Sequence, residues 1–361
     1  MPGPVAPRRP VDRGGLHGAR AVVAGVGRHG PRPRVGGVAQ VDDTLTDLAL
    51  SRGTLDRAAH ERGRPGAVRE LLADPRTRVV EVRGDRLHTV PDGSGALALS
   101  TRAPEPADAD RLVLHLGRDA DGVAHVAVVE PAADVVTDAS APSVASDASD
   151  GWLTLRQAGE AMAARDAGVF TTALALAHWH ASHRFCPRCG APTEAVQAGW
   201  VRRCTREGSE HYPRTDPAVI MSVVDRDDRL LLGRGAHWPE GRFSVLAGFV
   251  EPGESFEAAV AREVHEEVGI VIEGARYLGN QPWPFPSSVM IGFAATTSAT
   301  DLVPDPAEIA EARWVTREEY RYLLVGGTIR TPSGISIAKR IIELWLGATV
   351  ESVTGGPSPR W

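Results

Sequence analysis

The sequence has 361 residues, of which 42% are hydrophobic, so it can fill the cores of two or three domains. No apolar run approaches the roughly eighteen residues of a membrane span, and the run that follows Arg8 and Arg9 is too short for a signal-peptide core. The net charge of −6 argues against a protein that binds nucleic acid through a generally basic surface, and a cytoplasmic enzyme is the simplest interpretation.

The part of the chain before the cysteines is predicted to hold four segments. Residues 1–40, rich in Gly, Pro and Arg, are expected to be disordered, with contact between their arginines and RNA as an alternative. Residues 41–130 are expected to form a mixed α/β domain, because a helical pattern near 55–72 precedes short alternating runs that suggest strands. A linker at 131–150 and a helical connecting segment at 151–183 follow. The predicted strands are 79–82, 112–116 and 123–129.

All three cysteines of the chain lie close together in the next segment, at Cys186, Cys189 and Cys204. An odd number of cysteines excludes a complete disulfide framework. Close spacing in an intracellular chain favours metal binding over redox chemistry. The sequence therefore predicts a metal site here.

After the cysteines, the pattern changes to strands with helices on either side. This alternation predicts an α/β sandwich at 213–347, followed by a flexible tail at 348–361. The predicted strands are 217–224, 229–232, 243–249, a strand around Tyr277, and 291–295, and the predicted helices are 255–268 and 335–346.

The first of these helices carries three glutamates. Glu263, Glu266 and Glu267 stand at positions i, i+3 and i+4, so a helix places them side by side. At about 100° per residue, Glu263 and Glu267 fall on the same side as Phe256 and Val260. A solvated run of charges would lie opposite the apolar face instead. The outward face goes to Ala258, Ala261 and His265.

Carboxylates of like charge on an inward face are unfavourable unless something neutralises them. A divalent cation does so, and hard cations such as Mg²⁺ prefer carboxylate oxygens. The alternative is a helix whose acids are paired with arginines, of which Arg262 is the nearest.

The residues around the helix decide between these two interpretations. The segment from Gly248 to Ile270 resembles the complete Nudix box, GX5EX7REUXEEXGU, with every fixed position filled. The resemblance implies a Nudix hydrolase, in which Mg²⁺ or Mn²⁺ assists the attack of water on phosphorus. The implied metal ligands are the backbone carbonyl of Ala247 and the side chains of Glu263, Glu266 and Glu267.

The same three glutamates are the candidate catalytic residues. The general base is left open between Glu266 and Glu267. Other box residues have implied supporting roles, since two glycines allow the loop to bend and an ion pair braces it against the helix. These residues are Gly248, Gly253, Glu254 and Arg262.

Residues 280–288 read Asn-Gln-Pro-Trp-Pro-Phe-Pro-Ser-Ser. Prolines at alternate positions exclude an ordinary helix or a central strand, so we predict a stiff loop that presents Trp283 and Phe285. Rigid aromatic faces suit stacking on a base or a pyridine ring. A proline-stiffened connector whose aromatic side chains cap the core explains the composition equally well.

This segment closely resembles SQPWPFPxS, the tract that marks NADH pyrophosphatases among Nudix proteins, with Asn280 in place of the first serine. The resemblance implies hydrolysis of NAD(H) to AMP and nicotinamide mononucleotide, and in some members removal of NAD caps from RNA 5′ ends. It also implies a homodimer, and it adds Glu308 to the metal site. The implied substrate contacts are Gln281, Pro282, Trp283, Pro284, Phe285, Pro286, Ser287, Ser288 and, through its backbone, Ala338.

NADH pyrophosphatases carry a four-cysteine zinc ribbon just before the Nudix domain, which implies a zinc-ribbon-like module with structural Zn²⁺ at 184–212. Glu207 stands where the fourth cysteine would be, and a carboxylate oxygen can bind zinc. His211 is an alternative fourth ligand, and a weak or absent zinc site is a third possibility. The remaining ligands are Cys186, Cys189 and Cys204.

Two further questions stay open from the sequence. The resemblance places Tyr212 against the substrate, whereas a tyrosine that packs between the ribbon and the Nudix domain is as good an interpretation. The competing functions are a Nudix hydrolase of ADP-ribose or dinucleoside polyphosphates, and a non-catalytic nucleotide sensor.

Overall fold

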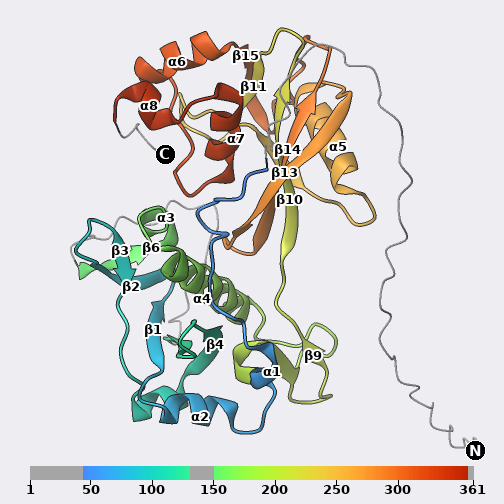
Figure 1. Cartoon of the computed structure of the whole chain (residues 1–361). Helices are drawn as coiled ribbons and strands as arrows, with labels where there is room; N and C mark the ends of the chain where they lie inside the picture. Colours follow the sequence, from blue (N-terminus) through green and yellow to red (C-terminus); the bar gives the residue numbers. More distant parts are fainter. Residues whose placement is uncertain (1–43, 131–149, 357–361) are drawn as a thin grey trace, which may run out of the picture. The chain divides into compact units, whose positions relative to one another are not determined.

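The computed structural model describes residues 44–130 and 150–356, all of which belong to one compact unit, Asp42–Trp361. Figure 1 shows the arrangement of its helices and strands. The arm predicted at 1–40 and nearly all of the linker predicted at 131–150 lie outside the described residues.

The N-terminal part is built on a six-stranded sheet with the order β3-β2-β1-β5-β4, in which β6 also pairs with β2. Strands β1 and β5 are parallel, and the other neighbours are antiparallel. The strands are β1 (Arg78–Arg83), β2 (Arg86–Pro91), β3 (Leu97–Leu99), β4 (Leu112–Arg118), β5 (Ala124–Val129) and β6 (Trp152–Thr154). The mixed α/β character predicted for this region is confirmed.

Helix α4 (Ala164–Ser182) packs against this sheet and provides much of its core, including the fully buried Phe170 and Leu174. The other helices of this part are short: α1 (Ala59–Arg62), α2 (Ala67–Ala73), α3 (Leu155–Ala158) and the 3₁₀ turn η1 (Pro106–Asp110).

The helical connecting segment predicted at 151–183 is interrupted. Its start is the strand β6, where Leu153 pairs with Leu87 of β2. A capping box formed by Thr154 and Gln157 then begins α3, and Gly159 ends it after one turn. Hydrophobic periodicity did not predict this strand or the break after α3, because the apolar residues of this segment fit a helix as well as a strand.

Two buried histidines of this part give the fold a defined sensitivity to acid. His115 on β4 is fully buried and neither ring nitrogen has a hydrogen-bond partner in the described part of the chain. His180 on α4 is 4% exposed, with a ring nitrogen 2.8 Å from the carbonyl of Gly199. Burial lowers the pKa of each imidazole from 6.5 to about 4.

Below pH 6.5 the unfolded chain therefore takes up protons that the folded chain does not. We expect the free energy of unfolding to fall between pH 6.5 and 4, by about 1.4 kcal/mol per pH unit for each histidine. Urea unfolding at a series of pH values measures this slope, and His115→Phe should make it shallower. An unchanged slope in that variant would remove His115 from the explanation.

The next module is a three-stranded antiparallel sheet with the order β7-β8-β9. It consists of β7 (Thr193–Val196), the 3₁₀ turn η3 (Gln197–Gly199), β8 (Val201–Cys204) and β9 (Glu210–His211). The indole nitrogen of Trp200 donates to the carbonyl of His115 at 2.7 Å. A side chain at Gly199 would meet Leu114 at 2.5 Å, so this module lies tightly against β4.

The C-terminal part is a sheet with the order β13-β14-β10-β11-β15, with β12 paired to β10. Val219, Met221 and Val223 of β10 face the core beneath helix α5, whereas Ile220 faces the core beneath α7. Helices cover both faces, and the predicted α/β/α sandwich is confirmed (Figure 1). The elements are β10 (Asp216–Val224), β11 (Leu230–Gly235), β12 (Leu246–Phe249), α5 (Phe256–Val268), β13 (Gly274–Trp283), β14 (Ser288–Thr296), β15 (Ile309–Val315), α6 (Arg317–Val325), α7 (Ile337–Leu346) and α8 (Val350–Thr354).

Strand β15 and helix α6 were not predicted from the sequence, and two further details differ from the predictions. The predicted tail contains α8, which is capped by Thr349 and held by the fully buried Val350, so residues 349–354 are part of the fold. The predicted stiff loop at 280–288 is shorter than expected, because β13 extends to Trp283. Pro282 is compatible with this strand because β13 lies at the edge of the sheet.

No helix among residues 44–130 and 150–356 has the length and apolar character needed to cross a membrane.

Candidate metal and substrate site

Helix α5 presents its glutamates on two different faces. It begins at the capping side chain of Ser255 and ends at Gly269, whose φ of 74° suits glycine. Glu263 and Glu267 are 8% and 7% exposed, on the buried side together with Val260. The side chain of Glu266 is 58% exposed. The predicted inward face is therefore present, except that Phe256 in the first turn is 43% exposed.

Arg262 connects the helix to the loop before it. Its guanidinium donates to Glu254 at 2.7 Å, to Glu263 at 2.9 Å and to Glu266 at 2.8 Å. It also donates to the carbonyl of Phe249 at 2.8 Å. The pairing of acids with arginine, which the sequence left as an alternative, thus holds for two of the three helix glutamates.

Glu267 is the exception. Its Oε2 atom is buried and has no hydrogen-bond partner in the described residues. Burial raises the pKa of Glu267 to about 8, and the charges of Glu263 and Glu308 act in the same direction. Burial also raises the pKa of Glu263. A buried carboxylate without a partner, close to other carboxylates, is an arrangement that a bound cation would stabilise.

The strand opposite the helix leaves room for these carboxylates. The Glu263 side chain lies directly over Gly248 of β12, where an added Cβ would come within 1.9 Å of its Cδ. Ala247, whose carbonyl is a candidate ligand, is exposed on the same strand. Glu308 is exposed, and its loop is joined to the end of α5 by a hydrogen bond from the Asp305 amide to the Glu267 carbonyl at 2.9 Å.

The candidate substrate tract has one buried end. Gln281 is fully buried and donates through Nε2 to the carbonyl of Ile335 at 2.7 Å, while its Oε1 has no partner among the described residues. At the other end, Ser287 donates to Asp216 at 2.8 Å. Ala338 is 3% exposed in the first turn of α7, which follows Ile335.

Trp283 and Phe285 meet edge to face, with ring centroids 4.9 Å apart. Both rings pack against the core of the N-terminal part, in agreement with the alternative in which they cap a core. The guanidinium of Arg156 lies 5.0 Å from the Trp283 ring and 3.9 Å from the Phe285 ring. The sequence did not connect Arg156 with this tract, because Arg156 stands more than a hundred positions before it.

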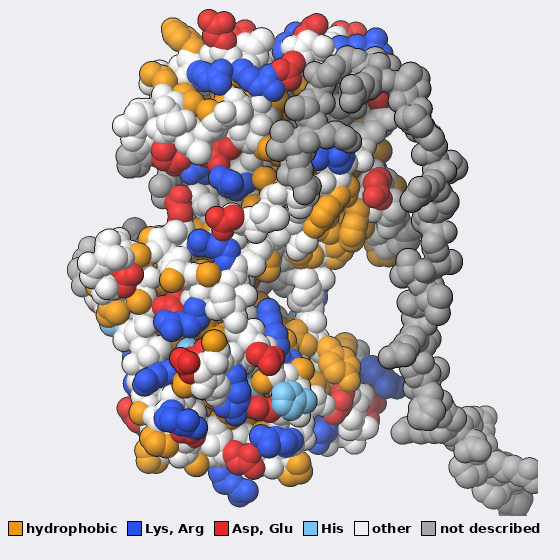
Figure 2. All heavy atoms as spheres, in the orientation of Figure 1, with side chains coloured by type: hydrophobic (Ala, Val, Ile, Leu, Met, Phe, Trp, Pro, Cys, Tyr) orange, Lys and Arg blue, Asp and Glu red, His pale blue; other side chains and the backbone are white. Residues whose placement is uncertain are grey.

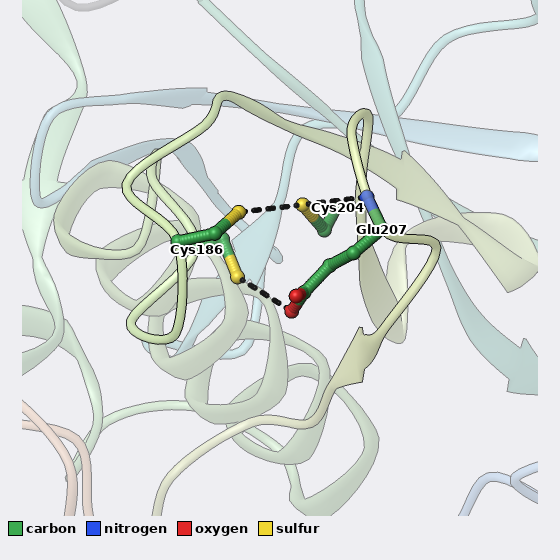
Figure 3. Close-up of side chains that lie close together, drawn as sticks. Cys186, Cys204 and Glu207 are labelled. Atoms are coloured by element: carbon green, nitrogen blue, oxygen red, sulfur yellow. Dashed lines mark hydrogen bonds between the residues drawn. The ribbon is translucent and has the colours of Figure 1, made fainter. Parts of the chain in front are cut away.

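The three cysteines and Glu207 form a compact group, with their ligand atoms all within 4.8 Å of one another. Cys186 Sγ lies 3.4 Å from Glu207 Oε1, and Cys189 Sγ lies 3.4 Å from Cys204 Sγ. The contact between Cys186 and Glu207 is drawn as a dashed line in Figure 3. Burial raises the pKa of Cys186, but hydrogen bonds from the amides of Arg188 and Cys189 outweigh it and lower the pKa to about 6. The group is therefore suited to binding a thiophilic cation.

His211 lies next to this group, in contact with Ser209. Its Nε2 is 3.3 Å from the hydroxyl of Ser209, which itself donates to Glu207 at 2.7 Å. Tyr212 is 65% exposed and its hydroxyl donates to Glu210 at 3.2 Å, so it does not pack between two cores. Of the two candidate fourth ligands, the structure brings Glu207 to the three thiols.

The sandwich with its glutamate-bearing helix defines the class of protein, and comparison with known proteins agrees. The NUDIX domain model matches residues 214–330. The NADH pyrophosphatase zinc ribbon domain matches residues 181–212, and the NADH pyrophosphatase-like rudimentary NUDIX domain matches residues 76–179.

Two sets of relatives extend this result. The NAD-capped RNA hydrolases NudC of Mycobacterium bovis and Mycobacterium tuberculosis are 41% identical over 326 residues, which cover 85% of this chain and 98% of each relative. The human NAD-capped RNA hydrolase NUDT12 is 41% identical over 194 residues, which cover 50% of this chain and 42% of that protein. The chain belongs to the NADH pyrophosphatase family of Nudix hydrolases.

The close approach at Gly248 provides a test of the site. We expect Gly248→Ala to lower kcat/KM of the hydrolase by about 10²-fold, because the new methyl group displaces the Glu263 carboxylate. Steady-state kinetics and thermal unfolding measure the two effects separately. Gly274→Ala is the matched control, since a Cβ there meets nothing within 4 Å. Equal activity in the two variants would contradict the placement of Glu263.

Proposed function

We propose that this protein hydrolyses the pyrophosphate bond of NAD(H), giving AMP and NMN(H), in a reaction that requires a divalent cation. The requirement for a divalent cation is inferred from the buried, unpartnered carboxylate of Glu267 beside Glu263 in the Nudix helix. The assignment of NAD(H) as the substrate is based on the 281–288 tract and on the relatives, which are named as hydrolases of NAD-capped RNA. NAD-capped RNA is accordingly a second proposed substrate.

The proposed ligands of Mg²⁺ or Mn²⁺ are the Ala247 carbonyl and the carboxylates of Glu263, Glu266, Glu267 and Glu308. A cation held there would neutralise the charge of the diphosphate and would lower the pKa of the attacking water. Arg262 keeps Glu263 and Glu266 in position through its hydrogen bonds. Glu267 and Glu266 remain the two candidates for general base.

Substrate binding is assigned to residues 281–288, Tyr212 and Ala338. Trp283 and Phe285 keep a fixed geometry through their mutual contact and through Arg156, which favours the ordered binding of a planar ring. Zn²⁺ is proposed to bind Cys186, Cys189, Cys204 and Glu207 in a structural role. We further propose that the protein acts as a homodimer in the cytoplasm.

A substrate comparison tests the proposal. Purified protein is incubated with Mn²⁺ and NADH, ADP-ribose or diadenosine polyphosphates, and kcat/KM is compared. NADH should be among the best substrates. A clear preference for ADP-ribose or a dinucleoside polyphosphate would make this chain a different Nudix hydrolase, and nucleotide binding without turnover would make it a sensor.

A further inference from the structure

A pocket lined by arginines lies between the N-terminal sheet and the β7-β8-β9 module, apart from the residues assigned above to metal and substrate. It has a volume of about 430 Å³, and its walls come from the α1–α2 turn, β4, β7, η3 and β8. Among the described residues that line it there is no aspartate or glutamate. The arginines of this pocket, called the arginine pocket below, are Arg62, Arg64, Arg69, Arg111 and Arg203.

The composition of the pocket is opposite to that of the chain as a whole, which has 46 acidic and 40 basic residues. On the face drawn in Figure 2, basic side chains are frequent over the region of α1 and α2, with some acidic ones between them. Since acidic residues outnumber basic ones in the chain, a cavity with five arginines and no acid is a local feature that needs a reason of its own.

The positive charge of the pocket is only partly neutralised. Arg69 is exposed and forms no ion pair with any described residue, and Arg62 is likewise without a carboxylate partner there, with its Nε atom buried and unpartnered. Arg64 and Arg203 each pair with one carboxylate, at 3.3 and 3.4 Å. Arg111 lies 3.7 to 3.9 Å from three carboxylates, those of Glu81, Asp108 and Glu130.

An arginine with a purely structural role in the same domain looks different. Arg102 lies 2.7 Å from both carboxylate oxygens of Asp108 and 2.9 Å from Glu81. Such bidentate pairing satisfies the guanidinium within the protein. The arginine pocket instead leaves donors available, and burial together with the nearby Arg57 lowers the pKa of Arg62. A bound anion would relieve both effects.

The pocket is also held rigidly. The guanidinium of Arg62 stacks on Trp200, 3.5 Å from the ring centroid, and Trp200 is fixed to β4 by its hydrogen bond to His115. The facing turn contains Gln197 and Ala198 with φ of 51° and 49°, a backbone conformation that non-glycine residues rarely adopt. Strained backbone of this kind is retained only where the surroundings enforce it, so this wall of the pocket is fixed.

We propose that the arginine pocket binds backbone phosphates of single-stranded RNA, namely the RNA body of a capped substrate. The proposal rests on the proposed function, since it gives that enzyme a contact with the RNA beyond the cap. Guanidinium groups match phosphate geometry, and these five come from three separate segments of the chain, which suits a chain of phosphates better than one small anion. The exposed Arg64 and Arg69 are accessible to a polymer.

The test measures RNA binding without catalysis. Full-length protein is titrated against a fluorescein-labelled, uncapped single-stranded RNA of about twenty nucleotides, with anisotropy recorded between 50 and 200 mM NaCl. Arg64→Glu combined with Arg69→Glu should raise Kd by about tenfold or more and reduce the slope of log Kd against log salt by about 1 to 2. Arg226→Glu, a 75% exposed arginine on another turn, is the control with the same change of charge per residue.

Turnover of free NADH separates this inference from the proposed function, because it should be equal in the wild type and in all variants. An inactive wild type would refute the proposed function while the binding titration still tests the pocket. Wild-type RNA affinity and salt slope in the double variant would overturn the inference. The inference would also be overturned if the wild type bound orthophosphate but not RNA, and if the double variant lost that orthophosphate binding. Should the double variant fail to fold, Arg69→Ala removes one exposed donor and should still weaken RNA binding.

Discussion

Glu267→Gln is expected to lower kcat/KM for NADH by about 10³-fold, because it removes either a metal ligand or the general base. The amide has nearly the same shape as the carboxylate, so the fold is kept. Glu257→Gln, on the exposed side of the first turn of the same helix, is the matched control and should retain full activity. A Glu267→Gln enzyme with wild-type kinetics would refute the assignment of the metal site.

The same variant has a second, opposite effect on stability without metal. The pKa of Glu267 is about 8 in the folded protein and 4.5 in the unfolded chain, so only the folded state keeps this proton between those values. The free energy of unfolding therefore falls as pH rises from 4.5 to 8, with a total cost on the order of a few kcal/mol. In EDTA at pH 8, Glu267→Gln should be more stable than wild type to urea. A less stable variant would contradict the buried, unpartnered carboxylate.

Glu207→Ala is expected to strip zinc from the ribbon, since it leaves three thiolates without the oxygen that lies 3.4 Å from Cys186. Structural zinc contributes folding free energy directly, about 10 kcal/mol or more in small zinc modules, so the loss should also lower Tm. Glu207→Cys should keep one zinc per chain and bind it more tightly, because it gives the four-thiolate set. Zinc content by atomic absorption and Tm by calorimetry measure these effects.

His211→Ala is the control for this series. His211 contacts both Ser209 and Cys186, but it does not belong to the set of ligand atoms within 4.8 Å of one another, so the variant should keep its zinc. The opposite pattern, with zinc retained in Glu207→Ala and lost in His211→Ala, would identify His211 as the fourth ligand. A wild type without zinc would show that three cysteines and a glutamate do not form a site.

The features that the sequence predicted well depend on local spacing. The inward position of Glu263 and Glu267 follows from helical periodicity, and the cysteine group follows from two short sequence segments. The sandwich was predictable for the same reason, since its strands and helices alternate with clear patterns. Strands β6 and β15 were not predicted, because they are recognised only by their pairing with strands that lie far away in the sequence.

The other missed features arise from tertiary contacts. Arg156 meets Trp283 and Phe285 only because the N-terminal part packs against the 281–288 tract. The arginine pocket combines three separate segments, 62–69, 111–113 and 195–203, and no short motif contains all of them. The helix at 350–354 was taken for a tail because it is short, although Val350 anchors it in the core.

The most direct test of the account is the identity of the products formed from NADH. Reaction in Mn²⁺ should give equal amounts of AMP and reduced nicotinamide mononucleotide by mass spectrometry, and excess EDTA should stop it. Release of nicotinamide with ADP-ribose, or turnover unaffected by EDTA, would contradict metal-dependent cleavage of the pyrophosphate bond.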